Sequence, residues 1–136
     1  MIESLLLTTA RISTYDNNRV LTGASGFFFE RDERLFLVTS RHVVIDKPSK
    51  HFPNRLEIAL HTDERNLTRS AVLSLLLYED GKSIWRQGRD ASGEIDVAVV
   101  EIDRAALPES AVLRSFSPAH LQGTLQEVEV GSTLLV

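Results

Sequence analysis

The stretch Leu35-Phe36-Leu37-Val38-Thr39-Ser40-Arg41-His42-Val43-Val44 joins an apolar run to a polar step that carries a histidine. Large apolar and β-branched side chains predict a buried strand, so the polar step marks the point where this strand reaches the surface. Imidazole exchanges a proton near neutral pH more readily than other side chains do. His42 is therefore a candidate for acid–base chemistry, although a lone histidine beside an apolar run is more often a packed residue, and it needs a partner.

The composition indicates one globular domain. The chain has 136 residues, of which 43% are hydrophobic and 25% charged, enough for a single core. The net charge of -4, without a basic stripe, argues against nucleic-acid binding. The chain has no cysteine, which excludes disulfides, thiolate metal sites and a cysteine nucleophile.

Neither a signal peptide nor a membrane span is predicted. Glu3 lies where a signal peptide carries basic residues, and the apolar run at residues 5–7 is short. No other segment approaches the roughly 20 apolar residues that a membrane span needs. We therefore expect a cytoplasmic protein that does not associate with a membrane.

Short apolar or β-branched segments, separated by turn formers, recur along the chain. They predict strands at residues 4–12, 20–22, 27–29, 35–38, 55–61, 71–78, 95–102 and 128–136. Residues 71–78 are also apolar enough for a helix, but the turn that follows them makes a hairpin at least as plausible. Asp103 as a cap with Pro108 as a stop predicts a single helical turn at residues 103–108. Ser117 as a cap with Pro118 at the first helical position predicts another at residues 117–121. The pattern is that of an all-β protein, an antiparallel barrel or sandwich with one or two short helical turns.

Three segments are expected to interrupt or join these strands. Gly23-Ala24-Ser25-Gly26 predicts a break, with a bulge or a close backbone approach. The charged residues 31–34 predict an exposed tip between two strands. Residues 87–94, rich in glycine, aspartate and serine, predict a loop.

Asp96 is the candidate partner for His42. It lies between Ile95 and Val97 at the head of an apolar strand, where an unpaired carboxylate would be costly to bury. A carboxylate that accepts from one imidazole nitrogen fixes the tautomer and leaves the other nitrogen free to take a proton from a hydroxyl. The alternative is that Asp96 is simply the residue before a strand.

Four stretches together carry a resemblance to a known family. They are Thr22-Gly23-Ala24-Ser25-Gly26-Phe27, Leu37-Val38-Thr39-Ser40-Arg41-His42-Val43-Val44, Asp96-Val97-Ala98-Val99 and Val130-Gly131-Ser132. In order and spacing they resemble the glycine-containing strand, histidine turn, aspartate strand and second-barrel entry of the trypsin-like serine peptidases, especially the bacterial, cysteine-free branch. The resemblance implies that residues 1–120 form the six-stranded antiparallel β-barrel that is the N-terminal half of a chymotrypsin-like double barrel. Residues 121–136 would then be a linker and the first strand of a second barrel.

The same resemblance implies roles for the two candidate residues. His42 would be the general base and then the acid, and Asp96 its orienting carboxylate. The family's serine nucleophile lies in the second barrel, so we expect it beyond Val136 and expect the 136-residue chain alone to be inactive. Ser25 precedes the histidine, in a structural strand of the family, and is rejected as the nucleophile. The partners implied are a peptide or protein substrate and the second barrel of the same polypeptide, without a cofactor.

Other interpretations remain open from the residues. A non-catalytic, peptidase-like barrel could bind peptides or a protein partner, for instance along an exposed strand edge. His42, His51, His61 and His120 could form a metal site, but their spacing matches no common ligand pattern, and no metal is expected. Phe27-Phe28-Phe29 and Trp85 could form a recognition surface, for which core packing is the favoured alternative.

Overall fold

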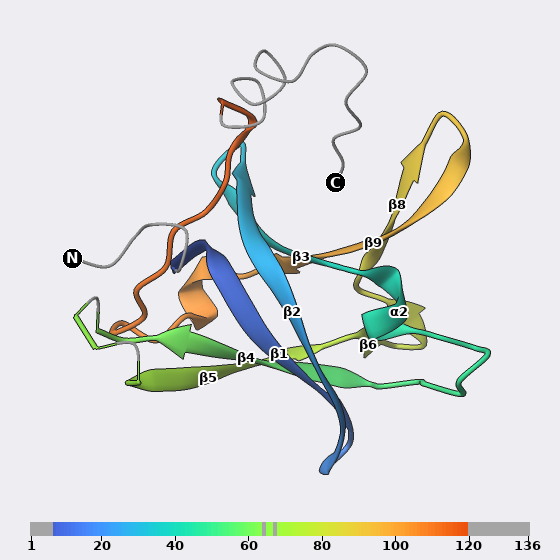
Figure 1. Ribbon diagram of the computed structural model, residues 1–136, viewed down its shortest axis with the longest axis horizontal. Helices are drawn as coiled ribbons and strands as arrows, with labels where there is room; N and C mark the ends of the chain where they lie inside the picture. The colour runs from blue at the N-terminus through green and yellow to red at the C-terminus, as the bar shows by residue number, and fades with distance from the viewer. Residues whose placement is uncertain (1–6, 64, 67, 120–136) are drawn as a thin grey trace.

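The computed structural model describes residues 7–63, 65–66 and 68–119 and confirms an antiparallel all-β chain (Figure 1). The predicted linker and strand at residues 121–136, including Val130-Gly131-Ser132, lie outside the described residues, as do His120 and the beginning of the first predicted strand. The described strands are β1 (Thr9–Asp16), β2 (Arg19–Arg31), β3 (Arg34–Thr39), β4 (Arg55–His61), β5 (Ser70–Leu76), β6 (Tyr78–Glu79), β7 (Lys82–Ser83), β8 (Arg86–Asp90) and β9 (Gly93–Ile102).

Seven of these strands form one curved sheet in the order β5-β4-β1-β2-β3-β9-β8, and β6 and β7 form a separate hairpin. The two edge strands of the sheet are β5 and β8. In the chain they are separated only by the β6–β7 hairpin. At the base of the hairpin, the Ile84 N–H donates to the Leu77 carbonyl at 2.8 Å. The expected six-stranded closed barrel is not found: the sheet has seven strands, and within the described part of the chain no ladder joins β5 to β8.

Successive side chains of a strand point to opposite faces of the sheet, and the core is formed by the side chains of one face. In β3, β4 and β9 alternate side chains are buried, and the register of β3 with β9 places Leu35 opposite Ile102 and Leu37 opposite Val100. The remaining side chains of the core come from the other strands and from α2, and the fully buried members include Ile12, Phe28, Val44, Leu56, Ile58 and Leu60.

The three consecutive phenylalanines of β2 face both sides of the sheet, as expected for adjacent strand residues. Phe28 is buried in the core, and Phe27 on the opposite face packs edge-on against Phe116, with ring centroids 5.6 Å apart. Trp85 packs against the core from its margin. Core packing rather than an exposed recognition surface therefore describes Phe28 and Trp85.

The chain after β9 returns to the sheet beside the beginning of β1. The Val112 N–H donates to the His61 carbonyl at 2.7 Å, and Phe116 exchanges backbone hydrogen bonds with Phe28 and Glu30. Since β1 pairs with β2 only as far as Thr9 opposite Phe27, Phe116 occupies the β2 edge that β1 leaves open. This segment extends the hydrogen bonding of β2 beyond its hairpin partner.

The predicted break at Gly23-Ala24-Ser25-Gly26 is wrong, because β2 runs through it without interruption. The register shift of this hairpin lies before it, at Leu21 of β2, which is skipped between the pairs Thr14–Thr22 and Tyr15–Val20. The close approach expected there does occur: a Cβ at Gly26 would lie 2.5 Å from the Val38 carbonyl oxygen. The glycine thus serves the packing of β2 against β3 rather than a break in the strand.

The predicted loop at residues 87–94 is also wrong, because these residues form most of the β8–β9 hairpin. Gly88 lies at the register shift between Gln87 and Arg89, where a Cβ would lie 2.8 Å from the Val97 Cβ, and Gly93 has a φ of 120° at the turn. The glycines that suggested a loop are needed for a bulge and a tight turn instead.

Short helical segments complete the described part: α2, the 3-10 turn η1, and residues 7–8 and 118–119, of which the last pair falls in the predicted turn at residues 117–121. The predicted turn after β9 is confirmed as a 3-10 turn, η1 (Arg104–Ala106), in which the Ala105 N–H donates to the Asp103 carboxylate at 3.0 Å. The turn α2 (Arg41–Val44), which follows β3, was not expected. Within the described residues, no helix has the length and apolar character required to cross a membrane.

Replacing Gly26 by alanine tests the close packing of β2 on β3. The added Cβ meets a backbone oxygen that cannot move without the strand, and such overpacking costs about 1–3 kcal/mol of unfolding free energy. Chemical denaturation of the G26A variant measures this loss. The matched control is Gly23→Ala in the same strand, where a Cβ meets nothing within 4 Å and alanine should be neutral or slightly stabilising. Equal stability of the two variants would contradict the packing argument.

Candidate functional site

His42 and Asp96 meet where β3 ends beside β9. The last pair of the β3–β9 ladder is Thr39 with Ala98, and beyond it the chain turns into α2 instead of continuing as a strand. Asp96 shares the strand face of Ala98, Val100 and Ile102, so its carboxylate points toward the space that α2 occupies. Packing of Val43 and Val44 in the core holds this turn over the carboxylate.

One carboxylate makes two contacts with the same residue. Asp96 Oδ2 lies 2.7 Å from the His42 Nδ1 atom, and Asp96 Oδ1 accepts from the His42 backbone N–H at 3.0 Å. The second contact satisfies an N–H in the first turn of α2, where the N-cap residue Ser40 makes no side-chain cap. Asp96 therefore fixes both the helical turn that carries the histidine and the orientation of its ring.

The charge of Asp96 is stabilised by these contacts. Partial burial raises the pKa of the Asp96 carboxyl, but the hydrogen bonds from the His42 ring and backbone N–H, with the charges of His42 and Arg41, outweigh it and hold this pKa below the ordinary value of 3.8. Both side chains remain accessible, with exposed fractions of 61% for His42 and 53% for Asp96. The pair is a surface arrangement at which a second molecule or domain can arrive.

The His42–Asp96 pair is arranged to accept a proton at one atom of the imidazole ring. With Nδ1–H donating to the carboxylate, the Nε2 atom carries the lone pair and is the proton acceptor. No hydrogen bond to Nε2 is found among the residues that the structure describes. A hydroxyl brought to Nε2 would find a base whose tautomer and ring orientation are already set.

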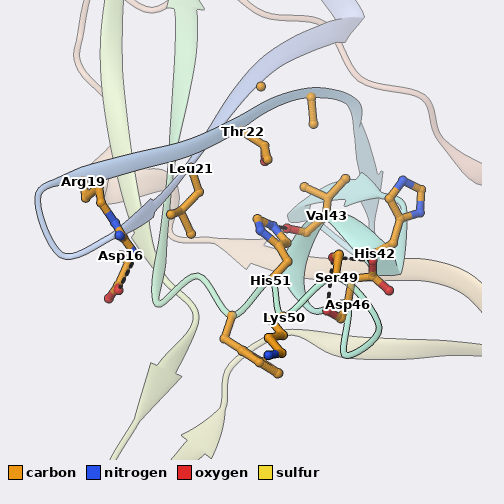
Figure 2. Close-up of a pocket in the computed structure, with 13 residues that line it drawn as sticks. Asp16, Arg19, Leu21, Thr22, His42, Val43, Asp46, Ser49, Lys50 and His51 are labelled. Carbon is orange, nitrogen blue, oxygen red and sulfur yellow. Dashed lines mark hydrogen bonds and ion pairs between the residues drawn. The ribbon is translucent and has the colours of Figure 1, made fainter.

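A groove of about 620 Å³ begins at His42 and runs between the first half of β2 and the loop after α2 (Figure 2). The apolar part of its lining comes from Leu21, Val43 and Phe52, and Phe52 is more than half exposed. Arg19 and Lys50 supply positive charge, Asp16 and Asp46 negative charge. Figure 2 shows the His42 ring at one end of this lining, extending away from His51 and Asp46.

A second hollow, of about 360 Å³, lies beside Asp96. Asp96 and Ser40 contribute to its lining together with Phe27, Val38, Val97 and Phe116. The half-buried aromatic and β-branched side chains alternate in this lining with polar residues, among them Thr9, Thr39 and Ser25, which therefore shares the hollow with Asp96. His42 thus lines one hollow and Asp96 the other.

The other predicted site residues are not brought to this pair by any hydrogen bond. Ser25 lies in the middle of β2 opposite Arg11, and its carbonyl accepts from the buried Thr39 hydroxyl at 2.9 Å. His51 Nε2 lies 2.9 Å from the Val43 carbonyl oxygen. His61 lies at the far end of β4, with an Nδ1 atom that is buried and has no hydrogen-bond partner among the described residues. In the same part of the chain, no group of three or more possible metal ligands is found.

Sequence reasoning missed the helical turn that carries His42. Ser40 before Arg41 is a common N-cap residue, and Val43 and Val44 are the two side chains that a single buried turn would supply. The signal was hidden because four residues are too few for helical periodicity to be recognised. The second contact of Asp96, to the backbone of His42, has no signal in the sequence.

The double contact predicts a pH-dependent contribution of Asp96 to stability. A carboxyl whose pKa is lowered by folding stabilises the folded state above its unfolded pKa, and this contribution is lost as the pH falls through the folded pKa. Replacing Asp96 by asparagine should lower the unfolding free energy by up to about 1 kcal/mol at neutral pH, the range of exposed ion pairs. Urea unfolding of D96N and the parent chain should show this difference shrinking toward about pH 2.

Asp32→Asn, at the exposed β2–β3 tip, is the control and should leave the unfolding free energy nearly unchanged at neutral pH. A loss in D96N that is the same at neutral and acidic pH would show that the carboxylate charge contributes nothing.

In comparisons with known proteins, no family model, no curated protein and no solved structure matches this chain. The geometry of the His42–Asp96 pair is therefore the basis on which a function can be argued.

Proposed function

We propose that this chain is the N-terminal part of a trypsin-like serine endopeptidase, in which His42 is the general base and Asp96 its orienting carboxylate. The single observation that supports this most strongly is the Nδ1···Oδ2 distance of 2.7 Å between two residues 54 positions apart in the chain. A carboxylate on Nδ1 and an accessible Nε2 are the two requirements for taking a proton from a serine hydroxyl and later giving it to a leaving amine.

The barrel interpretation is part of this proposal. We count β5 and β8 as the two halves of one bent strand that is interrupted by the β6–β7 hairpin. The first half pairs with β4 and the second with β9. Counted in this way, the sheet has six strands that follow one another around the core. The Ile84–Leu77 hydrogen bond supports the close approach of the two halves that such a closure needs.

The proposal places the nucleophile outside this chain, on a second barrel of the same polypeptide beyond Val136. The half-buried side chains of Phe27, Val38 and Val97, which line the hollow beside Asp96, support docking of that barrel there. The serine would then approach Nε2, and the substrate would lie in the cleft between the barrels, with the groove beyond His42 as one wall. Docking would also remove water from an exposed pair and strengthen its electrostatic interaction.

A serine-reactive fluorophosphonate probe tests the proposal in two forms of the protein. The 136-residue chain should show no stable labelling, because it is predicted to lack an activated serine. A polypeptide extended through the natural reading frame past Val136 should be labelled, and His42→Ala should slow this labelling by at least about a thousandfold, the scale of losing a triad member.

Labelling of any serine in the 136-residue chain would overturn the placement of the nucleophile. A reading frame that stops at Val136, or that continues without a serine that the probe labels, would instead favour a peptidase-like module that binds peptides or a protein partner. Val72 and Leu76 are exposed on the edge strand β5, and this exposure supports the binding module as a second candidate function.

A further inference from the structure

The outer edge of the sheet at β5 carries backbone groups that pair with no other described strand. The Thr62 N–H donates to the Arg69 carbonyl at 3.2 Å and the Leu77 N–H to the Asn54 carbonyl at 3.0 Å. Because hydrogen-bonded pairs alternate in an antiparallel ladder, the intervening bonded pairs are Leu60–Ala71, Ile58–Leu73 and Leu56–Leu75. The N–H and C=O groups of Ser70, Val72, Ser74 and Leu76 therefore point away from β4, and none joins a ladder with another described strand.

The side chains of this edge are unusual for an exposed strand. Val72 and Leu76 have exposed fractions of 59% and 60% and lie on the same outward face of β5, with Ser74 between them. Edge strands of monomeric proteins usually carry lysine, proline or a bulge, which prevent pairing with another chain. From Ser70 to Leu77 this chain has neither a charged residue nor a proline, and the β4–β5 register is regular. Figure 1 shows β5 at the lower margin of the sheet.

The edge is complementary to itself. In an antiparallel pairing about a two-fold axis at Ser74, Val72 of one copy lies opposite Leu76 of the other, and Ser74 lies opposite Ser74. This register joins the residues whose backbone groups point outward, so each copy can donate to and accept from the other.

We propose that β5 is a homodimer interface, in which two copies of this chain join their sheets through antiparallel pairing of residues 72–76. Six backbone hydrogen bonds and two Val72–Leu76 contacts form across the axis. A second copy fits this edge because the apolar residues Val72 and Leu76 and the neutral centre at Ser74 match under the two-fold operation. The contact is small, so the dimer is weak and depends on concentration.

Sedimentation velocity of the 136-residue chain from about 10 μM to about 1 mM should show a monomer passing into a dimer. Val72→Lys and Leu76→Glu should each weaken dimerisation by at least about tenfold, because each places a charge opposite an apolar residue of the other copy. The double variant V72K/L76E should restore it, since lysine then faces glutamate twice across the axis. Ser92→Lys, at the exposed β8–β9 turn, is the control and should dimerise like the parent chain.

Amide hydrogen exchange locates the interface independently. Exchange at Val72, Ser74 and Leu76 should slow by at least about tenfold as the concentration rises through the dissociation constant. A monomer at every concentration would overturn the proposal, as would a dimer that neither single variant weakens. A monomer in which these amides are already protected would place another part of the chain on the edge and would equally overturn it. None of these outcomes depends on peptidase activity.

Discussion

The pairing of β3 with β9 is the constraint on which both the core and the candidate site depend. Its register sets Leu35 against Ile102 and Leu37 against Val100, and a shift of one residue would turn these side chains out of the core. The same register ends at Thr39 opposite Ala98, and this determines that the next turn lies over Asp96. The histidine and the carboxylate are thus aligned by hydrophobic packing several residues away from them.

The site itself adds little to the stability of the fold. Both side chains are more than half exposed, so their interaction is screened by solvent, whereas Val43 and Val44 of the same turn are buried. Asp96 nevertheless imposes order, because it accepts from the backbone and the ring of one residue and so couples the position of α2 to the direction of the imidazole. An orientation fixed in this way is available before any partner or substrate arrives, which lowers the cost of reaching a reactive geometry.

The edges of the sheet differ in how they are completed. The β2 edge beyond β1 is filled by Phe116, whose backbone bonds to Phe28 and Glu30 and whose ring packs on Phe27. The β5 edge has no such segment among the described residues and presents two exposed apolar side chains. The hollow beside Asp96 presents the half-buried Phe27, Val38, Val97 and Phe116 among polar residues. These two surfaces, on different parts of the molecule, are the ones proposed above for association, one with a second copy and the other with a second barrel.

Alternation of apolar residues was sufficient to predict the β4 strand with its bounds, because strand periodicity is a local property. The charged residues 31–34 predicted the β2–β3 tip, and an apolar run predicted the strand that contains Asp96. The pairing of His42 with Asp96 was inferred from residue type and resemblance, but the contact with the backbone of His42 depends on where β3 ends against β9. The close approach at Gly26 was predicted correctly, but the strand break at residues 23–26 and the loop at 87–94 were not. The same residue serves a loop, a bulge and a close approach, and only the neighbouring strand decides which. Residue chemistry is thus encoded locally, whereas the distances that make it a site arise from pairing between strands that are remote in the chain.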